Sequence, residues 1–271
     1  MAGTGDNIDD VQTRFLEEVS KPETLTRLLQ MILPHVRQDQ RKTAYILAQT
    51  DRFGHLAMEP FFLRSIFGGA YDNFILVMQA RETERVNRAL FDMVTANFTV
   101  IENADEILRM MGVLNNGIGH IGPVDLALIS PAALARNFSK FVAGGGKPRF
   151  LEPDAALLEK GAAFLERTGV DPADKFVVLH ARDMSYMPEV AMEASNRLRC
   201  ATIANYRSTI DWLVERGYWV FRIGDTESPQ LDHPSSRVVD VPFLAVYDDF
   251  MDVFLLARYD FALVCSSGPR L

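Results

Sequence analysis

Short apolar runs typical of β-strands alternate with longer segments of helical periodicity along most of the chain. From residue 41 onward the runs "TAYILAQ", "NFILVMQA" and "FTVIEN" are each followed by a helical segment. The same alternation resumes after residue 150 with "KFVVLHA", "YWVFRIG", "RVVDV" and "FALVCS". Strands that are connected through helices form parallel sheets covered on both faces. The pattern therefore predicts an α/β fold with two Rossmann-like lobes.

A weaker pattern between residues 112 and 149 separates the two lobes. Glycines accumulate there and the stretch ends in "AGGGKPR", which is typical of a linker or of mobile loops. The length of 271 residues also exceeds that of the usual domain, about 100–150 residues. We expect a helical segment over 1–40, a Rossmann-like domain with its linker over 41–149, and a second Rossmann-like domain over 150–271. This second domain is expected to be truncated, since the sequence stops shortly after its last strand.

The helix expected over residues 203–216 has recognisable ends. Thr202 is suited to cap its N-terminus with its hydroxyl group, and Arg216 is favourable in the last turn. Gly217 is typical of the left-handed residue that ends a helix. The sequence therefore predicts one continuous helix between these residues.

Composition and charge exclude several classes of protein. The net charge of -8 argues against a protein that binds a long nucleic acid by neutralising its phosphates. Cys200 and Cys265 have no paired spacing, so neither a disulfide framework nor a zinc site is indicated. The polar, acidic N-terminus is unlike a secretory signal, and no apolar stretch approaches the roughly 20 residues of a membrane span. We expect a cytoplasmic protein, and peripheral contact with the inner face of a membrane stays open.

The loops that follow the expected strands are unusually polar. Ligands of open parallel sheets bind beyond the carboxyl ends of the strands. In "VVLHARD", His180 and Arg182 lie on the same side of the strand, and a guanidinium at Arg182 is suited to a bidentate pair with a phosphate. Asp183 would orient Arg182 or bind a hydroxyl group. The alternative interpretation is an Arg–Asp salt bridge at a strand end.

Three further strand ends carry residues of the same kind. "CSSG" offers hydroxyl and backbone N–H groups for an anion, although a plain turn is the alternative interpretation. "DRFGH" supplies a cation and an imidazole, and His55 and Glu59 share one helical face at a spacing of four. The alternative interpretation is that Arg52, His55 and Glu59 are ordinary surface residues. The candidate residues at these ends are Ser266, Ser267 and Gly268, then Arg222, Gly224 and Asp225, and finally Arg52, Gly54, His55 and Glu59. His35, His120 and His233 are isolated, so we interpret them as structural or exposed.

Two catalytic motifs are missing from the sequence. It contains no G-x-x-x-x-G-K-[ST], which argues against a P-loop enzyme. It also lacks the G-x-S-x-G of a nucleophile elbow, so an α/β-hydrolase is not indicated.

Four spaced stretches resemble those of one family. "DRFGHLAMEP", "VVLHARD", "IANYRSTIDWLVERGYWVFRIGD" and "DVFLLARYDFALVCSSG" are similar to stretches of bacterial glycosyltransferases of the two-lobed GT-B type. That group is distantly similar to fucosyltransferases whose H-x-R strand end holds the donor diphosphate. The resemblance covers roughly residues 42–268. One departure is the segment 199–202, where the family tends to show Arg-Asn-Ala-Asp and this chain has Arg-Cys-Ala-Thr.

The resemblance implies a role for each candidate residue. Arg182, with His180 and Asp183, would hold the diphosphate of a nucleotide sugar, and residues 266–268 would close around the same phosphates. Arg222, Gly224 and Asp225 would line the nucleotide side. Arg52, Gly54, His55 and Glu59 would face the acceptor. Glu59, His55 and Asp183 are the candidates for the general base and stay unranked.

The function implied by the resemblance is transfer of a sugar from a nucleoside diphosphate sugar to a glycan, a lipid-linked acceptor or another hydroxyl group. Neither a metal nor a further cofactor is expected, because GT-B enzymes as a class need no metal and no D-x-D pair stands at a strand end. Two alternatives stay open. One is a truncated sugar-nucleotide-binding protein without turnover, and the other is a GT-B-shaped enzyme such as a sugar-nucleotide epimerase.

Overall fold

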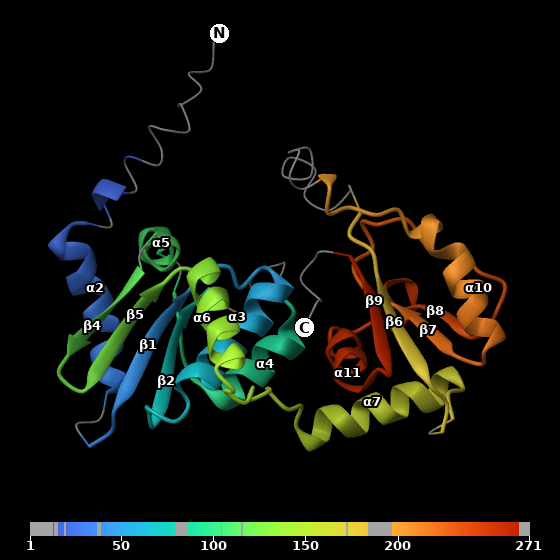
Figure 1. Cartoon of the computed structure of the whole chain (residues 1–271), viewed down its shortest axis with the longest axis horizontal. Coiled ribbons are helices and arrows are strands. Elements are labelled where there is room, and N and C mark those ends of the chain that lie inside the picture. The colour runs from blue at the N-terminus through green and yellow to red at the C-terminus, as the bar shows by residue number, and fades with distance from the viewer. Residues whose placement is uncertain are drawn as a thin grey trace, which may run out of the picture. The chain divides into compact units, whose positions relative to one another are not determined.

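The computed structural model describes residues 13, 16–18, 20–36, 39–79, 86–103, 105–114, 116–171, 173–183 and 197–265. Contacts between residues divide the chain into two compact units (Figure 1). Unit 1 comprises residues 1–86 and 94–151, and unit 2 comprises residues 87–93 and 152–271. The main division therefore falls after residue 151, two residues beyond the predicted domain boundary.

Unit 1 contains a sheet whose described strands follow the order β3-β2-β1-β5-β4. Its strands are β1 (Lys42–Leu47), β2 (Asn73–Met78), β3 (Thr99–Glu102), β4 (Asn116–Ile121) and β5 (Val124–Ile129). The helices in this part of the chain are α2 (Pro22–Ile32), the short 3-10 helix η1 (Leu33–His35), α3 (Phe53–Phe67), α4 (Arg88–Asn97), α5 (Glu106–Leu114) and α6 (Pro131–Ala143). Strands β1, β2, β3 and β5 run parallel, and β4 pairs antiparallel with β5.

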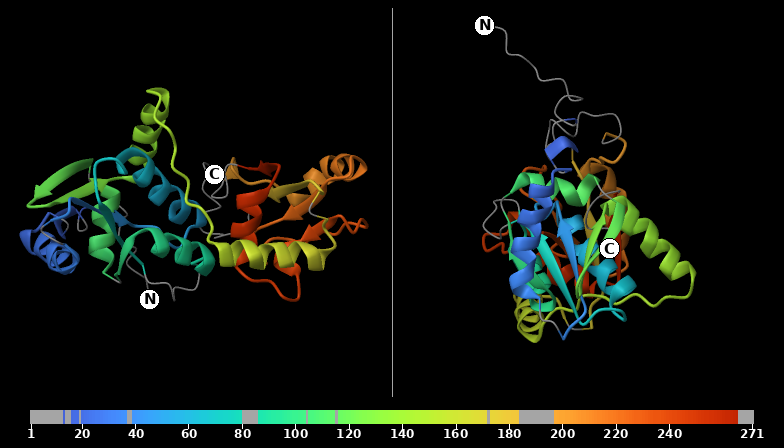
Figure 2. Two further views of the ribbon diagram at one scale, coloured as in Figure 1. Left: turned by 90° about the horizontal axis from the view of Figure 1, so that it is seen from below. Right: turned by 90° about the vertical axis from the view of Figure 1, so that its left-hand side faces the viewer.

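Both faces of this sheet are covered by helices (Figures 1 and 2). On one face, Ala44 and Ile46 of β1 pack with Leu28 of α2 and Leu108 of α5. The opposite face carries Tyr45, whose hydroxyl group reaches Glu59 of α3. Burial on both faces explains why β1 and β2 are almost continuously apolar. The N-terminal helix α2 is thus a layer of this unit.

The prediction of a linker or of mobile loops over residues 112–149 was wrong for most of this range. The end of α5, the hairpin β4–β5 and helix α6 occupy residues 112–143, and no helix or strand spans residues 144–154. The pattern was weak because Gly117 and Gly119 lie in the exposed edge strand β4, which has no apolar face to bury. With Gly122 they match G-x-G-x-x-G, but these glycines form an antiparallel hairpin, whereas a dinucleotide site needs a strand-to-helix turn.

Unit 2 contains an entirely parallel sheet whose described strands follow the order β8-β7-β6-β9. Its strands are β6 (Phe176–His180), β7 (Trp219–Arg222), β8 (Val238–Asp240) and β9 (Phe261–Val264). Its helices are α7 (Ala155–Thr168), the 3-10 helix η2 (Ile203–Tyr206), α10 (Arg207–Glu215), the 3-10 helix η3 (Val241–Phe243) and α11 (Phe250–Arg258). The predicted α/β fold is confirmed, with Rossmann-like sheets that are parallel throughout in unit 2 and parallel except for β4 in unit 1 over the described strands. None of the described helices is long and apolar enough to cross a membrane.

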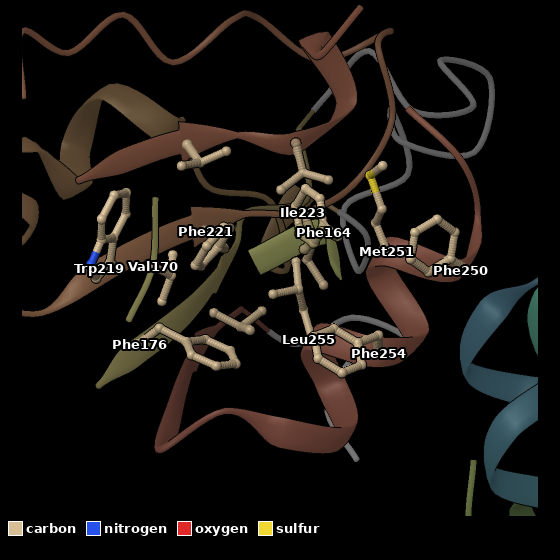
Figure 3. Packing of buried hydrophobic residues seen from close by; sticks show 13 residues of the cluster. Phe164, Val170, Phe176, Trp219, Phe221, Ile223, Phe250, Met251, Phe254 and Leu255 are labelled. Atoms are coloured by element: carbon tan, nitrogen blue, oxygen red, sulfur yellow. The ribbon is translucent and has the colours of Figure 1, made fainter. Parts of the chain in front are cut away.

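An aromatic core joins α7 and α11 to one face of the second sheet (Figure 3). The ring of Phe221 lies 5.4 Å from that of Phe176 and 6.0 Å from that of Phe164, measured between centroids. The other face packs Val177 and Val220 against Ile210 of α10. Each strand of this sheet therefore buries alternate side chains on opposite faces.

The helix predicted over residues 203–216 differs at its start. It opens with η2 and becomes α-helical at Arg207, and the Thr202 side chain makes no capping hydrogen bond. The prediction of a Thr202 cap was therefore wrong. The predicted end is confirmed, since Gly217 has a φ of 82°, where a side chain would be strained.

The contact between α7 and α11 depends on a residue without a side chain. A Cβ atom at Gly161 would overlap the ring of Phe254, which is 4% exposed and held in the core. We expect Gly161→Ala to lower the free energy of unfolding of unit 2 by about 1–3 kcal/mol, despite the better helix propensity of alanine. Urea unfolding followed by tryptophan fluorescence measures this, because Trp212 and Trp219 both lie in unit 2.

Phe254→Leu provides the matched background. Removing the ring relieves the overlap, so Gly161→Ala should cost clearly less in the Phe254→Leu protein than in the wild type. Equal costs in the two backgrounds would contradict the proposed contact.

Candidate functional site

Each sheet has a point at which the strand order reverses. In unit 1, β1 lies between β2 and β5, and in unit 2, β6 lies between β7 and β9. Ligands of doubly wound folds bind beyond the carboxyl ends of the strands at such a point. Predicted site residues follow β1 in unit 1 (Arg52, and Gly54, His55 and Glu59 of α3) and lie at the end of β6 in unit 2 (His180, Arg182 and Asp183), so each unit has its own candidate site.

His180 ends β6 and lies near two guanidinium groups. Burial, and then the positive charges of Arg222 and Arg182, together lower the pKa of His180 to about 4. The imidazole is therefore neutral near pH 7. Gly224 follows β7 with a φ of 135°, and a Cβ atom there would lie 3.6 Å from the His180 ring. The loop backbone thus passes close beside a neutral imidazole and the guanidinium group of Arg222.

Arg222 lies at the carboxyl end of β7 and is 1% exposed. Its Nη1 donates to Asp240 Oδ1 at 3.0 Å, and Asp240 Oδ2 accepts from the Leu231 N–H at 2.6 Å. Its Nε has no hydrogen-bond partner among the described residues. The guanidinium group of Arg222 is therefore a buried positive charge, held in place through Nη1 at the carboxyl end of β7. Its predicted contact with the nucleotide stays a prediction.

Asp225 shapes the loop after β7. Its Oδ1 accepts hydrogen bonds from the backbone N–H groups of Glu227 and Ser228 at 3.0 and 3.2 Å. This arrangement is an Asx-type turn, in which the side chain replaces a backbone acceptor. The structure therefore gives Asp225 a local structural role, and its role in binding a donor stays a prediction.

Backbone contacts hold the loop after β6 in place. The Arg182 N–H donates to Cys265 Sγ at the end of β9, and the Arg182 carbonyl accepts from the Ala201 N–H at 2.8 Å. The carbonyl of Asp183 accepts a weak hydrogen bond from Cys200 Sγ at 3.8 Å. Segment 200–201, where the chain departs from the family pattern, thus lies directly beside Arg182 and Asp183. Ser266, Ser267 and Gly268 lie outside the described residues.

Asp252 is a residue of this site that the sequence analysis missed. It lies in the first turn of α11 and is 7% exposed. Burial raises its pKa to about 7, while a hydrogen bond from the Tyr247 hydroxyl group acts in the opposite direction. The charges of Arg222 and Asp225 also act on it, so it belongs to the same cluster. The sequence feature that could have indicated Asp252 is an acidic residue inside the apolar run "FMDVFLL".

The candidate site of unit 1 contains a buried carboxylate with two hydrogen bonds. Glu59 of α3 is 2% exposed; its Oε2 accepts from the Tyr45 hydroxyl group at 2.5 Å, and its Oε1 lies 2.6 Å from His55 Nδ1. A carboxylate only accepts, so Nδ1 of His55 carries the proton. Burial, and then the charge of Glu59, raise the pKa of Tyr45. Tyr45 was missed because it lies in an apolar strand.

This geometry separates the roles of His55 and Glu59. The side chain of His55 is 32% exposed, and its Nε2 has no hydrogen-bond partner among the described residues. Glu59 is almost inaccessible and both its oxygens are engaged. An imidazole whose Nδ1 is held by a carboxylate presents Nε2 as a proton acceptor. Of these two residues, His55 is thus the one able to exchange a proton, and Glu59 orients it.

The loops after β1 and β2 also contain buried polar oxygens. Gln49 Oε1, Thr50 Oγ1 and Gln79 Oε1 have no hydrogen-bond partner among the residues that the structure describes. Arg52 lies immediately before α3, and Gly54 is buried in its first turn. An unsatisfied buried acceptor costs about 1–3 kcal/mol, so this edge of the sheet favours a ligand with hydroxyl groups. Over the described residues, no group of three His, Cys, Asp or Glu side chains is arranged to hold a metal ion.

The raised pKa of Asp252 makes the stability of unit 2 depend on pH. The folded state binds the proton of Asp252 up to about pH 7, whereas an unfolded chain releases it near 3.8. The folded state therefore holds more protons between these values, and its stability falls as the pH rises through this range. We expect Asp252→Asn to remove this loss, which amounts to about 1.4 kcal/mol for each unit of pKa difference.

Urea unfolding between pH 4 and 8, followed by tryptophan fluorescence, measures the effect. His180 contributes the opposite slope, because its lowered pKa makes the folded state bind fewer protons between about pH 4 and 6.5. His180 is present in both proteins, so its contribution cancels when the free energy of unfolding of the wild type is subtracted from that of Asp252→Asn at each pH. A difference that is flat with pH would contradict the raised pKa of Asp252.

The chain was also compared with known proteins. No protein-family model matches it, and neither a curated protein nor a solved structure does. The function is therefore argued from the residues themselves.

Proposed function

We propose that the protein is a metal-independent glycosyltransferase of the two-lobed GT-B type. It moves a sugar from a nucleoside diphosphate sugar to a hydroxyl group of a glycan or of a lipid-linked acceptor. The observation that carries the proposal is the reversal point of the second sheet, where His180 ends β6 and Arg182 follows it beside the end of β9. We place the reaction in the cytoplasm, with lipid-linked acceptors reached at the inner face of the membrane.

The electrostatics of unit 2 support binding of a diphosphate. Arg182 and Arg222 both lie near His180, since their charges lower its pKa. Two cations at one edge of a sheet favour an anion in a chain whose net charge is -8. A neutral His180 adds a hydrogen-bonding group without a further charge. The same groups would stabilise the negative charge that develops on the leaving diphosphate.

The hydrogen-bonded group of unit 1 supports a role in deprotonating the acceptor. In the proposed reaction the acceptor oxygen bonds to the anomeric carbon, and the bond from that carbon to the diphosphate oxygen breaks. The hydroxyl proton passes to Nε2 of His55, and the nucleoside diphosphate leaves with the bonding electrons. In the neutral imidazole, Glu59 fixes the tautomer with the proton on Nδ1, so Nε2 is the nitrogen that accepts the proton. Arg52 and Gly54 are proposed to contact the acceptor.

Donor binding is tested with a panel of nucleoside diphosphate sugars. We expect at least one of them to raise the melting temperature of the protein and to bind saturably in calorimetry. Arg182→Ala should weaken that binding about 10- to 100-fold, because a charge-assisted contact to phosphate is lost.

Arg258→Ala is the matched control for Arg182→Ala. It removes the same charge from an exposed residue in the last turn of α11, near the amino-terminal edge of the sheet where β9 begins. Its donor affinity should equal that of the wild type. A panel without any stabilising nucleotide sugar, or an unchanged affinity in Arg182→Ala, would overturn the proposed donor site.

The role of His55 is tested by turnover. We expect His55→Gln to lower the rate of nucleoside diphosphate release in the presence of acceptor by about 10²- to 10⁴-fold, with donor affinity unchanged. Glu59→Gln should shift the pH–rate profile, because Glu59 acts through His55. His120→Gln, at the amino-terminal edge of the same sheet, is the control and should keep wild-type turnover. Full turnover in His55→Gln would exclude it as the base.

A sugar-nucleotide-binding protein without turnover is the second candidate. The segment that departs from the family pattern lies against Arg182 through the hydrogen bond from the Ala201 N–H, so the departure falls within the proposed donor site. Saturable donor binding without release of nucleoside diphosphate, in the presence of cell glycans, would favour this second function.

A further inference from the structure

A polar cavity lies at the amino-terminal edge of the sheet of unit 1. It has a volume of about 410 Å³. The residues that line it are Pro34, His35, Gln40, Lys42, Asn73 and Thr99. Lys42, Asn73 and Thr99 are the first residues of β1, β2 and β3. The cavity is therefore at the opposite end of the strands from His55, and the proposed function does not use it.

Three neighbouring strands turn a polar residue towards the same face of the sheet. Side chains alternate along a strand, so Lys42 shares the face of Ala44 and Ile46, and Asn73 shares the face of Ile75. This face is otherwise the apolar core under α2 and α5. Asn73 Nδ2 donates to the Thr99 hydroxyl oxygen at 2.9 Å, which joins two of the three polar residues. An apolar core alone does not require these polar side chains.

Lys42 is buried with little to balance its charge. It is 4% exposed, and its Nζ donates to the carbonyl oxygen of His35 at 2.7 Å. Among the described residues no carboxylate lies within the 4.0 Å of an ion pair with it. A buried ammonium is costly unless an anion or several acceptors compensate it. Among the described residues, the positive charge of Lys42 thus has a carbonyl oxygen as its hydrogen-bond partner and no counter-charge.

The nearest acids along these strands are engaged elsewhere. Asp125 points to the opposite face of the sheet from Val124, the partner of Lys42 in the register, and accepts hydrogen bonds from Tyr71 and His120. The carboxylate of Asp72 accepts from the backbone N–H of Arg41. Neither acid neutralises Lys42.

We propose that this cavity binds a small polar anion, whose phosphate or carboxylate group pairs with the ammonium of Lys42. His35, Gln40, Asn73 and Thr99 supply hydrogen-bonding groups for hydroxyl groups on the same molecule. Among the described residues, no Phe, Tyr or Trp side chain lines the cavity, so the proposed ligand is a small polar molecule held by charge and hydrogen bonds. This site is distinct from the proposed donor and acceptor sites and does not rest on them.

Calorimetric titration of the full chain tests the proposal. The probes are inorganic phosphate, glycerol 3-phosphate and lactate, each titrated separately. We expect saturable binding of at least one probe to the wild type, and Lys42→Met should weaken it at least about 10-fold. Arg41→Met removes the same charge from the neighbouring, exposed residue and should leave the affinity unchanged. Binding of the two phosphates alone identifies a phosphate ligand, and binding of lactate alone identifies a carboxylate.

A second variant covers the case in which Lys42→Met does not fold. Thr99→Val keeps the shape of the side chain and removes the hydroxyl group from the cavity wall, so we expect it to weaken binding several-fold. Absence of saturable binding to the wild type would overturn the proposal, as would equal affinities of the wild type and the folded variants. Nucleotide-sugar binding in Arg182→Ala is measured separately, so failure of one site leaves the other test unaffected.

Discussion

Burial of both faces of the parallel strands in each sheet is the constraint on which the other features of the structure depend. Helices α2 and α5 cover one face of the first sheet, and α7 and α11 cover one face of the second. The strands must then be apolar along their length, and polar side chains are confined to strand ends. Both the charged groups at the carboxyl ends and the polar cavity at the amino ends follow from this restriction.

In the second unit, ionisable groups that are confined to the strand ends have shifted pKa values. His180 is partly buried and Asp252 is buried; both lie near Arg222, and removal from water disfavours the charged form of each. The imidazole loses its charge and the acid retains its proton to a higher pH, whereas the guanidinium remains charged and binds Asp240. Arg222 thus keeps its charge and its ion pair with Asp240, while the neighbouring His180 and Asp252 shift towards their neutral forms.

The sequence predicted the fold well where periodicity is strong. The strands of the second unit were expected within two residues of their bounds, because their apolar runs are buried on both faces. The hairpin β4–β5 was missed because its edge strand is exposed and rich in glycine. The capping role of Thr202 was wrong, because a 3-10 turn precedes α10 and the hydroxyl group makes no capping bond. The local sequence preferences of single residues do not predict an exposed edge strand or a 3-10 turn at the start of a helix.

The sequence by itself determined the fold class and the strand ends at which candidate residues gather, because both follow from the order of apolar and polar residues. Only the tertiary structure decided which of these residues meet. It joined Tyr45 and His55 through Glu59, placed Asp252 beside Arg222, and brought Lys42 and Thr99 to one cavity. The physical reason is that these contacts link different strands and helices, so they depend on register and packing, which a periodic pattern leaves open.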